Sequence, residues 1–248
     1  MRWVWLGLLA STAVFAGRPL TVDDAGPVAP GQFEFETGVA FEHAGNCHHF
    51  DFPLGLTAGI VKTLEAGIGF GGQLEERLED HGTGCTQSSI GDLALGLKWN
   101  PLAAERFWAD HALALTAKLP TADSEKDLGS GVADFDLTYI ATKSIGEQWN
   151  ADFNLGYTWV GGDDDALHYG LALRWQAMKH VELVGEVFAN TELAARQDTA
   201  MTAGVGARWE IMDGLVFDAA AGAGLRGESP DWTATIGFTW TFGFNNKK

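Results

Sequence analysis

The chain is poor in basic residues, in cysteine and in long apolar runs. Its 248 residues include 16 Lys and Arg against 33 Asp and Glu, which gives a formal net charge of −17. This acidity excludes nucleic-acid binding through clustered basic side chains. With only two cysteines, a disulfide-dense small scaffold is excluded too. Apolar residues nevertheless make up 46% of the chain, and Gly (32) and Trp (10) are abundant, so the composition is not that of a disordered chain.

The one long apolar run begins the chain. Arg2 precedes the run Trp3–Ala16, which ends in a small residue. A positive start, an apolar core and a small residue at the cleavage point are typical of a secretory signal peptide, and the run is too short to cross a bilayer as a helix. We therefore predict an exported protein with a signal peptide over 1–16 and a mature chain that begins at Gly17.

From Gly31 onward, apolar and polar residues alternate with a period of two, which is typical of β-strands. Near the start of this region, Phe33 and Phe35 alternate with Glu34 and Glu36. No stretch fits the period of a helix better. The pattern predicts twelve strands, over Phe33–Phe41, Leu54–Ile60, Leu64–Leu74, Leu93–Trp99, Phe107–Leu119, Phe135–Ala141, Trp149–Trp159, Leu167–Trp175, Val181–Ala189, Thr199–Trp209, Leu215–Leu225 and Trp232–Phe244.

The segments between these strands alternate in length. Short ones, such as Val61–Thr63 and Ile211–Gly214, are separated by longer polar ones at Ala44–Asp51, Glu79–Ser89, Thr121–Ala133, Gly161–Ala166, Thr191–Asp198 and Arg226–Asp231. Short turns on one rim and long loops on the other are typical of up-and-down transmembrane barrels. We therefore predict an all-β fold, a 12-stranded antiparallel up-and-down transmembrane β-barrel over 31–244. A periplasmic N-terminal segment over 17–30 precedes it, and a C-terminal tail over 245–248 follows.

The charges of the predicted strands fall on one face. A soluble β-sandwich also alternates, but in water it would expose its charged face and bury its apolar one. A membrane barrel places its apolar face on lipid and its polar face on the lumen. We find no charged residue on the apolar face. The residues predicted to line the lumen are Glu34, Glu36, Glu42, Glu65, Glu75, Asp92, Lys98, Asp110, Lys118, Asp134, Asp136, Asp152, Arg174, Glu182, Glu186, Arg208 and Asp218.

Tryptophan position separates the barrel from the sandwich. Seven tryptophans lie on the apolar face near strand ends: Trp99, Trp149, Trp175, Trp209 and Trp240 beside the short turns, and Trp159 and Trp232 beside the long loops. Indole rings prefer the level of the lipid headgroups, so these residues are predicted to form two aromatic girdles at the membrane interfaces. A sandwich core gives no reason for this sorting.

The last strand resembles a known assembly signal. In Thr235–Phe242 a polar residue and Gly237 are followed by aromatic residues at alternate positions, as in the C-terminal β-signal of bacterial outer-membrane proteins. The usual pattern ends on an aromatic residue, whereas here Asn245–Lys248 follow Phe244. The resemblance implies recognition by the barrel-assembly machinery and a location in the bacterial outer membrane.

A second resemblance extends over nearly the whole mature chain. It is carried by Thr21–Phe35, Gly91–Lys98, Leu119–Asp123 with Gly129–Gly131, Val184–Asn190 and Pro230–Phe242. In these stretches the chain resembles the family of outer-membrane transporters associated with the meta pathway of phenol degradation. The resemblance implies transport of small molecules, aromatic ones among them. It does not identify the cargo.

The two cysteines lie in neighbouring predicted long loops on the same rim. In an exported protein Cys47 and Cys85 are predicted to form a disulfide. The alternative is a tetrahedral zinc site made by these cysteines with nearby histidines, namely His43, His48, His49 and His81. Because the spacing matches no recognised zinc finger, we predict no metal.

Three classes of function remain open. A lipid-acting barrel enzyme needs a nucleophile beside His and an acid at the outer rim. The predicted lipid-facing residues include no Ser, so we predict neither catalysis nor a cofactor. A sealed structural barrel is the second class, because twelve strands lie between filled barrels and open porins. Many inward glycines favour the third class, a narrow channel for small solutes. Inward acids outnumber inward bases by 13 to 4, so we expect cations to pass more readily than anions. The other predicted partners of the protein are outer-membrane lipid and lipopolysaccharide.

Overall fold

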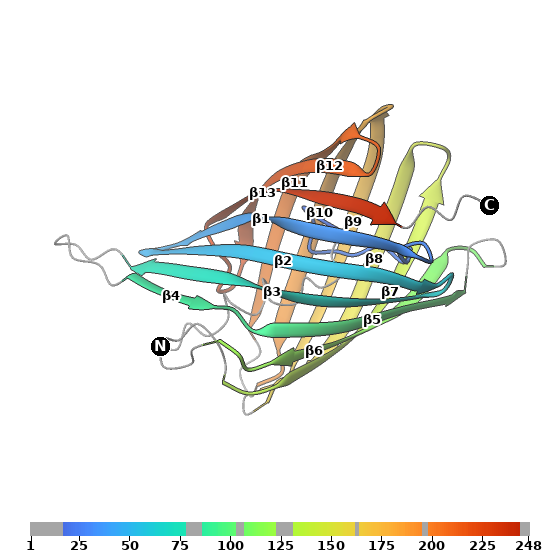
Figure 1. Ribbon diagram of the computed structural model, residues 1–248. Helices are drawn as coiled ribbons and strands as arrows, with labels where there is room; N and C mark the ends of the chain where they lie inside the picture. Colours follow the sequence, from blue (N-terminus) through green and yellow to red (C-terminus); the bar gives the residue numbers. More distant parts are fainter. Residues whose placement is uncertain are drawn as a thin grey trace.

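A computed structural model describes residues 17–77, 86–102, 107–122, 131–161, 164–194 and 198–243 (Figure 1). Within these residues the regular secondary structure consists of β-strands. In chain order they are β1 (Gln32–Ala44), β2 (Cys47–Val61), β3 (Leu64–Arg77), β4 (Thr86–Ile90), β5 (Leu93–Leu102), β6 (Asp110–Leu119), β7 (Asp134–Ile145), β8 (Trp149–Trp159), β9 (Ala166–Met178), β10 (Val181–Glu192), β11 (Thr199–Met212), β12 (Leu215–Arg226) and β13 (Trp232–Gly243). The predicted signal peptide, Cys85 and the C-terminal tail lie outside the described residues. No helix in the described ranges has the length and apolar character needed to cross a membrane.

The sheet closes on itself. Strands that follow one another in the chain pair antiparallel, except that β5 pairs with β3 and not with β4. β1 also pairs with β13, from Gln32 opposite Gly243 to His43 opposite Trp232. β4 and β5 share one position in the wall, because β3 pairs with β4 along its C-terminal part and with β5 along its N-terminal part. The thirteen described strands therefore occupy 13 − 1 = 12 positions. This confirms the predicted 12-stranded antiparallel barrel.

The interruption between β4 and β5 falls at Gly91 and Asp92. The Gly91 N–H donates to the carbonyl of Gly71 at 2.7 Å, which keeps the bulge attached to β3. On the other side, the backbone N–H groups of Thr121 and Ala122 donate to the Asp92 carboxylate at 2.9 Å. The sequence pattern predicted only the Leu93–Trp99 part of this wall position, since the polar residues of β4 do not alternate with apolar ones.

Strands also extend beyond the predicted ends. The predicted long loop Ala44–Asp51 is wrong, because β1 continues to Ala44 and β2 begins at Cys47. Polar residues beyond the apolar band still pair, for example Glu42 opposite His49. The chain reverses at Gly45, whose φ of 55° suits glycine. Conversely, β6 begins at Asp110 rather than at Phe107. We call the end with the short turns, such as Lys62-Thr63 between β2 and β3, the lower end, and the opposite end the upper end.

The two faces of the wall differ as the alternation predicts. On β5 the side chains of Leu95, Leu97 and Trp99 are exposed on the outer surface, whereas Ala94 and Lys98 are buried inside. The largest fully buried side chains include Glu65, Asp152 and Asp218. A chain that exposes its large apolar residues and encloses its charges has the inverted arrangement of membrane barrels.

The N-terminal segment, residues 17–30, lies inside the barrel. Its Leu20 and Val22 form one buried cluster with inward-facing Ala172, Val184 and Phe188. Its Ala25 forms another with Ala94, Ala112, Ala114 and Ile140. The sequence analysis expected a periplasmic segment and did not foresee this position. The segment has both apolar residues and unpaired backbone groups, and the inner wall provides partners for both.

Candidate functional site in the barrel lumen

The backbone of the N-terminal segment is hydrogen-bonded to polar side chains from several strands. Its N–H groups would be costly to bury without acceptors, so these bonds fix the segment across the lumen. Each bond runs from a backbone N–H of the segment to a side-chain oxygen of the wall: from Thr21 and Val22 to Glu186 of β10 (2.9 and 2.8 Å), from Asp23 to Asn154 of β8 (2.8 Å), from Ala25 to Thr142 of β7 (2.9 Å) and from Val28 to Glu65 of β3.

The charged side chains of the segment each meet an opposite charge on the wall. The pairs are Arg18 with Asp218 (3.3 Å), Asp23 with Lys98 (3.2 Å) and Asp24 with Arg174 (3.5 Å). Arg18 also donates to Thr235 Oγ1 at 2.8 Å. Removing one member of such a buried pair leaves an uncompensated charge, so these contacts make the seated position specific.

The wall itself contains further ion pairs between neighbouring strands. Glu65 and Lys98 face each other directly and approach to 3.1 Å, and Glu182 and Arg208 do so at 2.8 Å. The others are Asp152 with Arg174 (2.6 Å), and Lys118 with Asp92 (3.7 Å) and Asp134. His168 of β9 reaches across β8 and contacts Asp136 of β7 at 2.7 Å. Opposite charges on facing antiparallel strands attract each other in this way. These charges therefore tie strands of the wall together.

The aspartates of the segment lie in contrasting electrostatic surroundings. Burial raises the pKa of Asp23 to about 8, although Lys98 opposes the shift. The neighbouring carboxylates Asp24 and Glu65 add to the increase in the pKa of Asp23. Burial also acts on Asp24, but Lys98 and Arg174 outweigh it, and the pKa of Asp24 is lowered.

Four further residues of the predicted lumen set lie on β1, β3 and β6. Glu34 and Glu36 accept hydrogen bonds from Thr241 (3.3 Å) and Thr239 (3.2 Å) of β13. Glu75 accepts from Arg77 at 2.8 Å on the same strand. Asp110 lies directly opposite Thr142 of β7, near the lower end. Inward carboxylates therefore accept hydrogen bonds from hydroxyl groups as well as from basic side chains.

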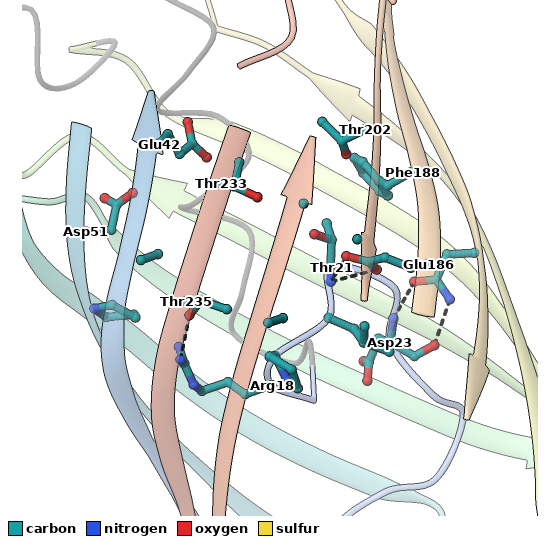
Figure 2. A pocket seen from close by; sticks show the side chains of 18 of the residues that line it. Arg18, Thr21, Asp23, Glu42, Asp51, Glu186, Phe188, Thr202, Thr233 and Thr235 are labelled. Atoms are coloured by element: carbon teal, nitrogen blue, oxygen red, sulfur yellow. Dashed lines mark hydrogen bonds between the residues drawn. The ribbon is translucent and has the colours of Figure 1, made fainter. Parts of the chain in front are cut away.

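The segment lies between two cavities. The upper cavity has a volume of about 230 Å³, and its lining includes Glu42, Asp51, Glu186, Phe188 and Thr202 of the wall as well as Arg18 and Thr21 of the segment (Figure 2). The lower cavity, about 150 Å³, is lined by Gly17, Asp23, Asp24, Gly26, Pro27, Val28, Glu34, Glu36, Thr57, Glu65 and Lys98. Asp23 and Glu36 line both, so they mark the level at which the two cavities meet.

Some functional residues were missed by the sequence analysis. Ile140, Val184 and Phe188 are apolar side chains at inward positions of otherwise polar faces, and all three contact the N-terminal segment. Large apolar residues on the lumen face were the available signal for an internal occupant. Asp51 was also missed, because it fell in a predicted loop.

The predicted interface tryptophans lie on the outer surface. The exposed fraction of their side chains ranges from 36% for Trp175 to 54% for Trp209, and the set also includes Trp99, Trp149, Trp159, Trp232 and Trp240. Trp149 stacks on Trp175 with ring centroids 5.4 Å apart. Cys47 begins β2 at the upper end. Its predicted disulfide partner Cys85 lies outside the described residues, so the bridge stays a prediction.

The fold and the occupied lumen together define a class of protein, the closed antiparallel β-barrel with a segment of its own chain inside. The chain belongs to the family described as "Putative MetA-pathway of phenol degradation", whose model matches residues 16–242. This confirms the family resemblance found in the sequence. No curated protein was found to match the chain.

Solved structures of other barrels share the fold. An outer-membrane channel from Pseudomonas putida F1 has a TM-score of 0.70 at 14% identity, covering 88% of this chain and 98% of that one. The NanC porin has a TM-score of 0.61 at 7% identity, covering 83% and 98%. The CymD monoaromatic hydrocarbon channel has a TM-score of 0.53 at 9% identity, covering 89% and 90%. At these identities the likeness is one of fold.

Proposed function

We propose that the protein is an outer-membrane channel through which small solutes pass without coupling to an energy source, and that it passes cations more readily than anions. The observation that carries the proposal is a closed barrel whose interior contains cavities above and below the N-terminal segment, in both of which acids outnumber bases among the lining residues. Outer-membrane lipid and lipopolysaccharide are the proposed surroundings of the exposed apolar face. The channels and porins that share the fold support this assignment.

The charge of the lining favours cations. The upper cavity is lined by six acids, Asp23, Glu36, Glu42, Asp51, Asp136 and Glu186, and by one arginine, Arg18, which is paired with Asp218. The lower cavity is lined by five acids and one lysine. Carboxylates around a narrow passage attract cations and repel anions, as the acidic rings of cation channels do.

The N-terminal segment sets the width of the proposed path. It divides the lumen where Asp23 and Glu36 line both cavities, so a solute that crosses the barrel passes these two carboxylates. Hydrogen bonds and ion pairs to the wall hold the segment in place. A path of this kind suits small solutes and excludes large hydrophilic ones.

A sealed structural barrel is the second candidate. The observation that favours it is the same segment, since its apolar residues and its backbone are bound by β3, β7, β8 and β10 in the lumen. In this case no ion would cross the barrel while the segment is seated.

Reversal potentials in a salt gradient across a planar bilayer test the proposal. The purified protein is expected to conduct with small unit currents and with a reversal potential of the sign given by cation preference. Glu36→Gln is expected to reduce that preference, whereas Glu76→Gln, which removes a carboxylate that lines neither cavity, leaves it unchanged. Anion preference would contradict the proposal, and the absence of any conductance would favour the sealed barrel.

A further inference from the structure

One corner of the upper cavity differs from the rest of the inner wall. Glu42 of β1 and Asp51 of β2 both point into the cavity there (Figure 2). Glu42 lies opposite His49, and Asp51 lies opposite Ala40, so the two carboxylates and the imidazole occupy neighbouring positions on a single pair of strands. Asp51 and His49 are both buried, each with 6% of its surface exposed.

One oxygen of each carboxylate in this corner lacks a hydrogen-bond donor. Among the described residues, the buried atoms Glu42 Oε2 and Asp51 Oδ2 have no hydrogen-bond partner. Other acids that line the same cavity are satisfied, since Glu186 accepts from the backbone of the N-terminal segment and Asp136 contacts His168 at 2.7 Å. A buried carboxylate without a donor is costly, so this corner is built for a group that the protein does not itself supply.

His49 does not fill that role. Its Nε2 lies 3.3 Å from Asp51 Oδ2, but the two atoms are not aligned for a hydrogen bond, and Nε2 is itself buried without a partner. Even a protonated imidazole offers only one proton from Nε2, which cannot serve two carboxylates on adjacent strands at once. A donor with several N–H groups between Glu42 and Asp51 would satisfy both.

The rest of the cavity decides what kind of cation fits. Within the described residues no group of three or more His, Cys, Asp and Glu side chains is arranged to hold a metal ion. The opposite side of the cavity is instead partly apolar, with Phe188, Ile140 and Leu20 in its lining. An alkylammonium group has three N–H donors for the carboxylates, and a hydrocarbon body would contact the apolar side.

We propose that the upper cavity binds small organic cations that carry a primary ammonium group on an apolar body. The ammonium group donates to Glu42 and Asp51, and the apolar body lies toward Phe188. This inference rests on the proposed function and names a class of solute for that channel. It requires a charged head and an apolar body in the same molecule, so neutral and anionic analogues of equal size are excluded from the corner.

Isothermal titration calorimetry on the full mature protein in detergent tests the proposal, with benzylamine, benzyl alcohol and benzoate at neutral pH as probes. Benzylamine is expected to bind at least tenfold more tightly than benzyl alcohol, and benzoate is not expected to bind. Glu42→Gln and Asp51→Asn are each expected to weaken benzylamine binding about tenfold or more. Glu76→Gln is the matched control on the neighbouring strand β3, outside the cavity lining, and is expected to bind as the unchanged protein does.

Equal affinity for benzylamine and benzyl alcohol would overturn the proposal, as would full binding by Glu42→Gln and Asp51→Asn. If these variants fail to fold, the comparison of the three probes on the unchanged protein decides the question alone. Conductance of the same preparation is measured in parallel. A conducting protein that does not discriminate benzylamine contradicts this inference and leaves the channel standing, whereas selective binding without conductance contradicts the channel and leaves the site.

Discussion

Two regions of the inner wall enclose carboxylates in opposite ways. Around the N-terminal segment, buried acids such as Glu65, Asp152 and Asp218 each meet a lysine or arginine. In the upper corner between β1 and β2, the buried oxygens of Glu42 and Asp51 meet none within the described residues. Both regions belong to the same closed sheet, so we attribute the difference to the different roles of the two sets of charges.

The comparison separates structural charges from functional ones. A buried ion pair adds little net stability. Removing one partner is nevertheless strongly destabilising, because it leaves the other charge buried and uncompensated. The pairs around the segment therefore specify where the segment sits. The unpaired corner contributes no such specificity and stays available to a solute.

Loss of Lys98 is expected to have the largest effect. Its side chain is 4% exposed and lies between Asp23 and Glu65. Lys98→Met leaves both carboxylates buried without a base and is expected to cost about 3–5 kcal/mol. Urea unfolding in detergent measures the loss. Lys62→Met in the exposed β2–β3 turn is the control, and combining Lys98→Met with Asp23→Asn and Glu65→Gln should recover most of the loss. Equal stability of the Lys98 and Lys62 variants would contradict the structural role.

A side chain too large for the space around Ala25 is expected to displace the N-terminal segment from the inner wall. Ala25 has no exposed surface and packs against Ala94, Ala112 and Ala114. Ala25→Phe does not fit this space, and overpacking costs about 1–3 kcal/mol or more. Since the barrel strands are unchanged, the expected result is a folded barrel whose unit conductance in planar bilayers is several-fold higher. Ala29→Phe, at an exposed position of the same segment, should conduct as the unchanged protein does. Equal conductance of the two variants would count against the segment as the constriction.

The barrel was predictable from the sequence because its signal repeats. Each of the twelve predicted strands shows the period of two, and the absence of charge from one face holds for all twelve. The position of the N-terminal segment was not predictable in the same way. It has no regular period, and its partners, such as Glu65, Asn154 and Glu186, come from strands far apart in the chain. Large apolar side chains at inward positions, such as Phe188, were the available signal, and Phe188 can be interpreted only together with Leu20 and Val22 of the segment.

The site was predictable in part. Glu42 was expected in the lumen from its phase in the first strand. Asp51 was not, because the polar run from Cys47 to Asp51 was interpreted as a loop, whereas β2 includes it. Polar residues beyond the apolar band lack the alternation on which the sequence argument depends. The corner formed by Glu42 and Asp51 therefore lies at the strand ends, where the alternation of apolar and polar residues no longer predicts the structure.

The seating of the segment is expected to depend on pH through Asp23. Because burial raises its pKa to about 8, the seated segment binds a proton that a free aspartate releases near pH 4. Seating is therefore strongest at low pH, weakens as the pH rises from about 4 to about 8, and then levels off. Conductance should rise over this range in the unchanged protein and rise less in Asp23→Asn. Identical pH profiles would contradict the role of Asp23.

The smallest effect is expected from the cysteines. Cys47 and Cys85 are predicted to be bridged in the mature protein, at the upper rim and away from the segment. Reduction should therefore leave the conductance unchanged, because the closed sheet already holds the strands. Mass spectrometry of non-reduced material checks the bridge. Two free thiols in freshly purified protein would refute it.

A cysteine pair tests most directly whether the N-terminal segment resides in the lumen. Asn100 of β5 donates to the Ala25 carbonyl, and the Ala25 N–H donates to the Thr142 hydroxyl of β7. Ala112 on the intervening strand β6 lies in the same buried cluster as Ala25. In a background with Cys47→Ser and Cys85→Ser, the pair Ala25→Cys and Ala112→Cys is expected to form a disulfide in protein extracted from membranes without unfolding. The exposed Ala29→Cys combined with Ala112→Cys should not. A bridge in the first variant alone, with unit conductance no higher than that of the unchanged protein, is the predicted result. Two free thiols in the first variant would contradict a segment seated inside the barrel.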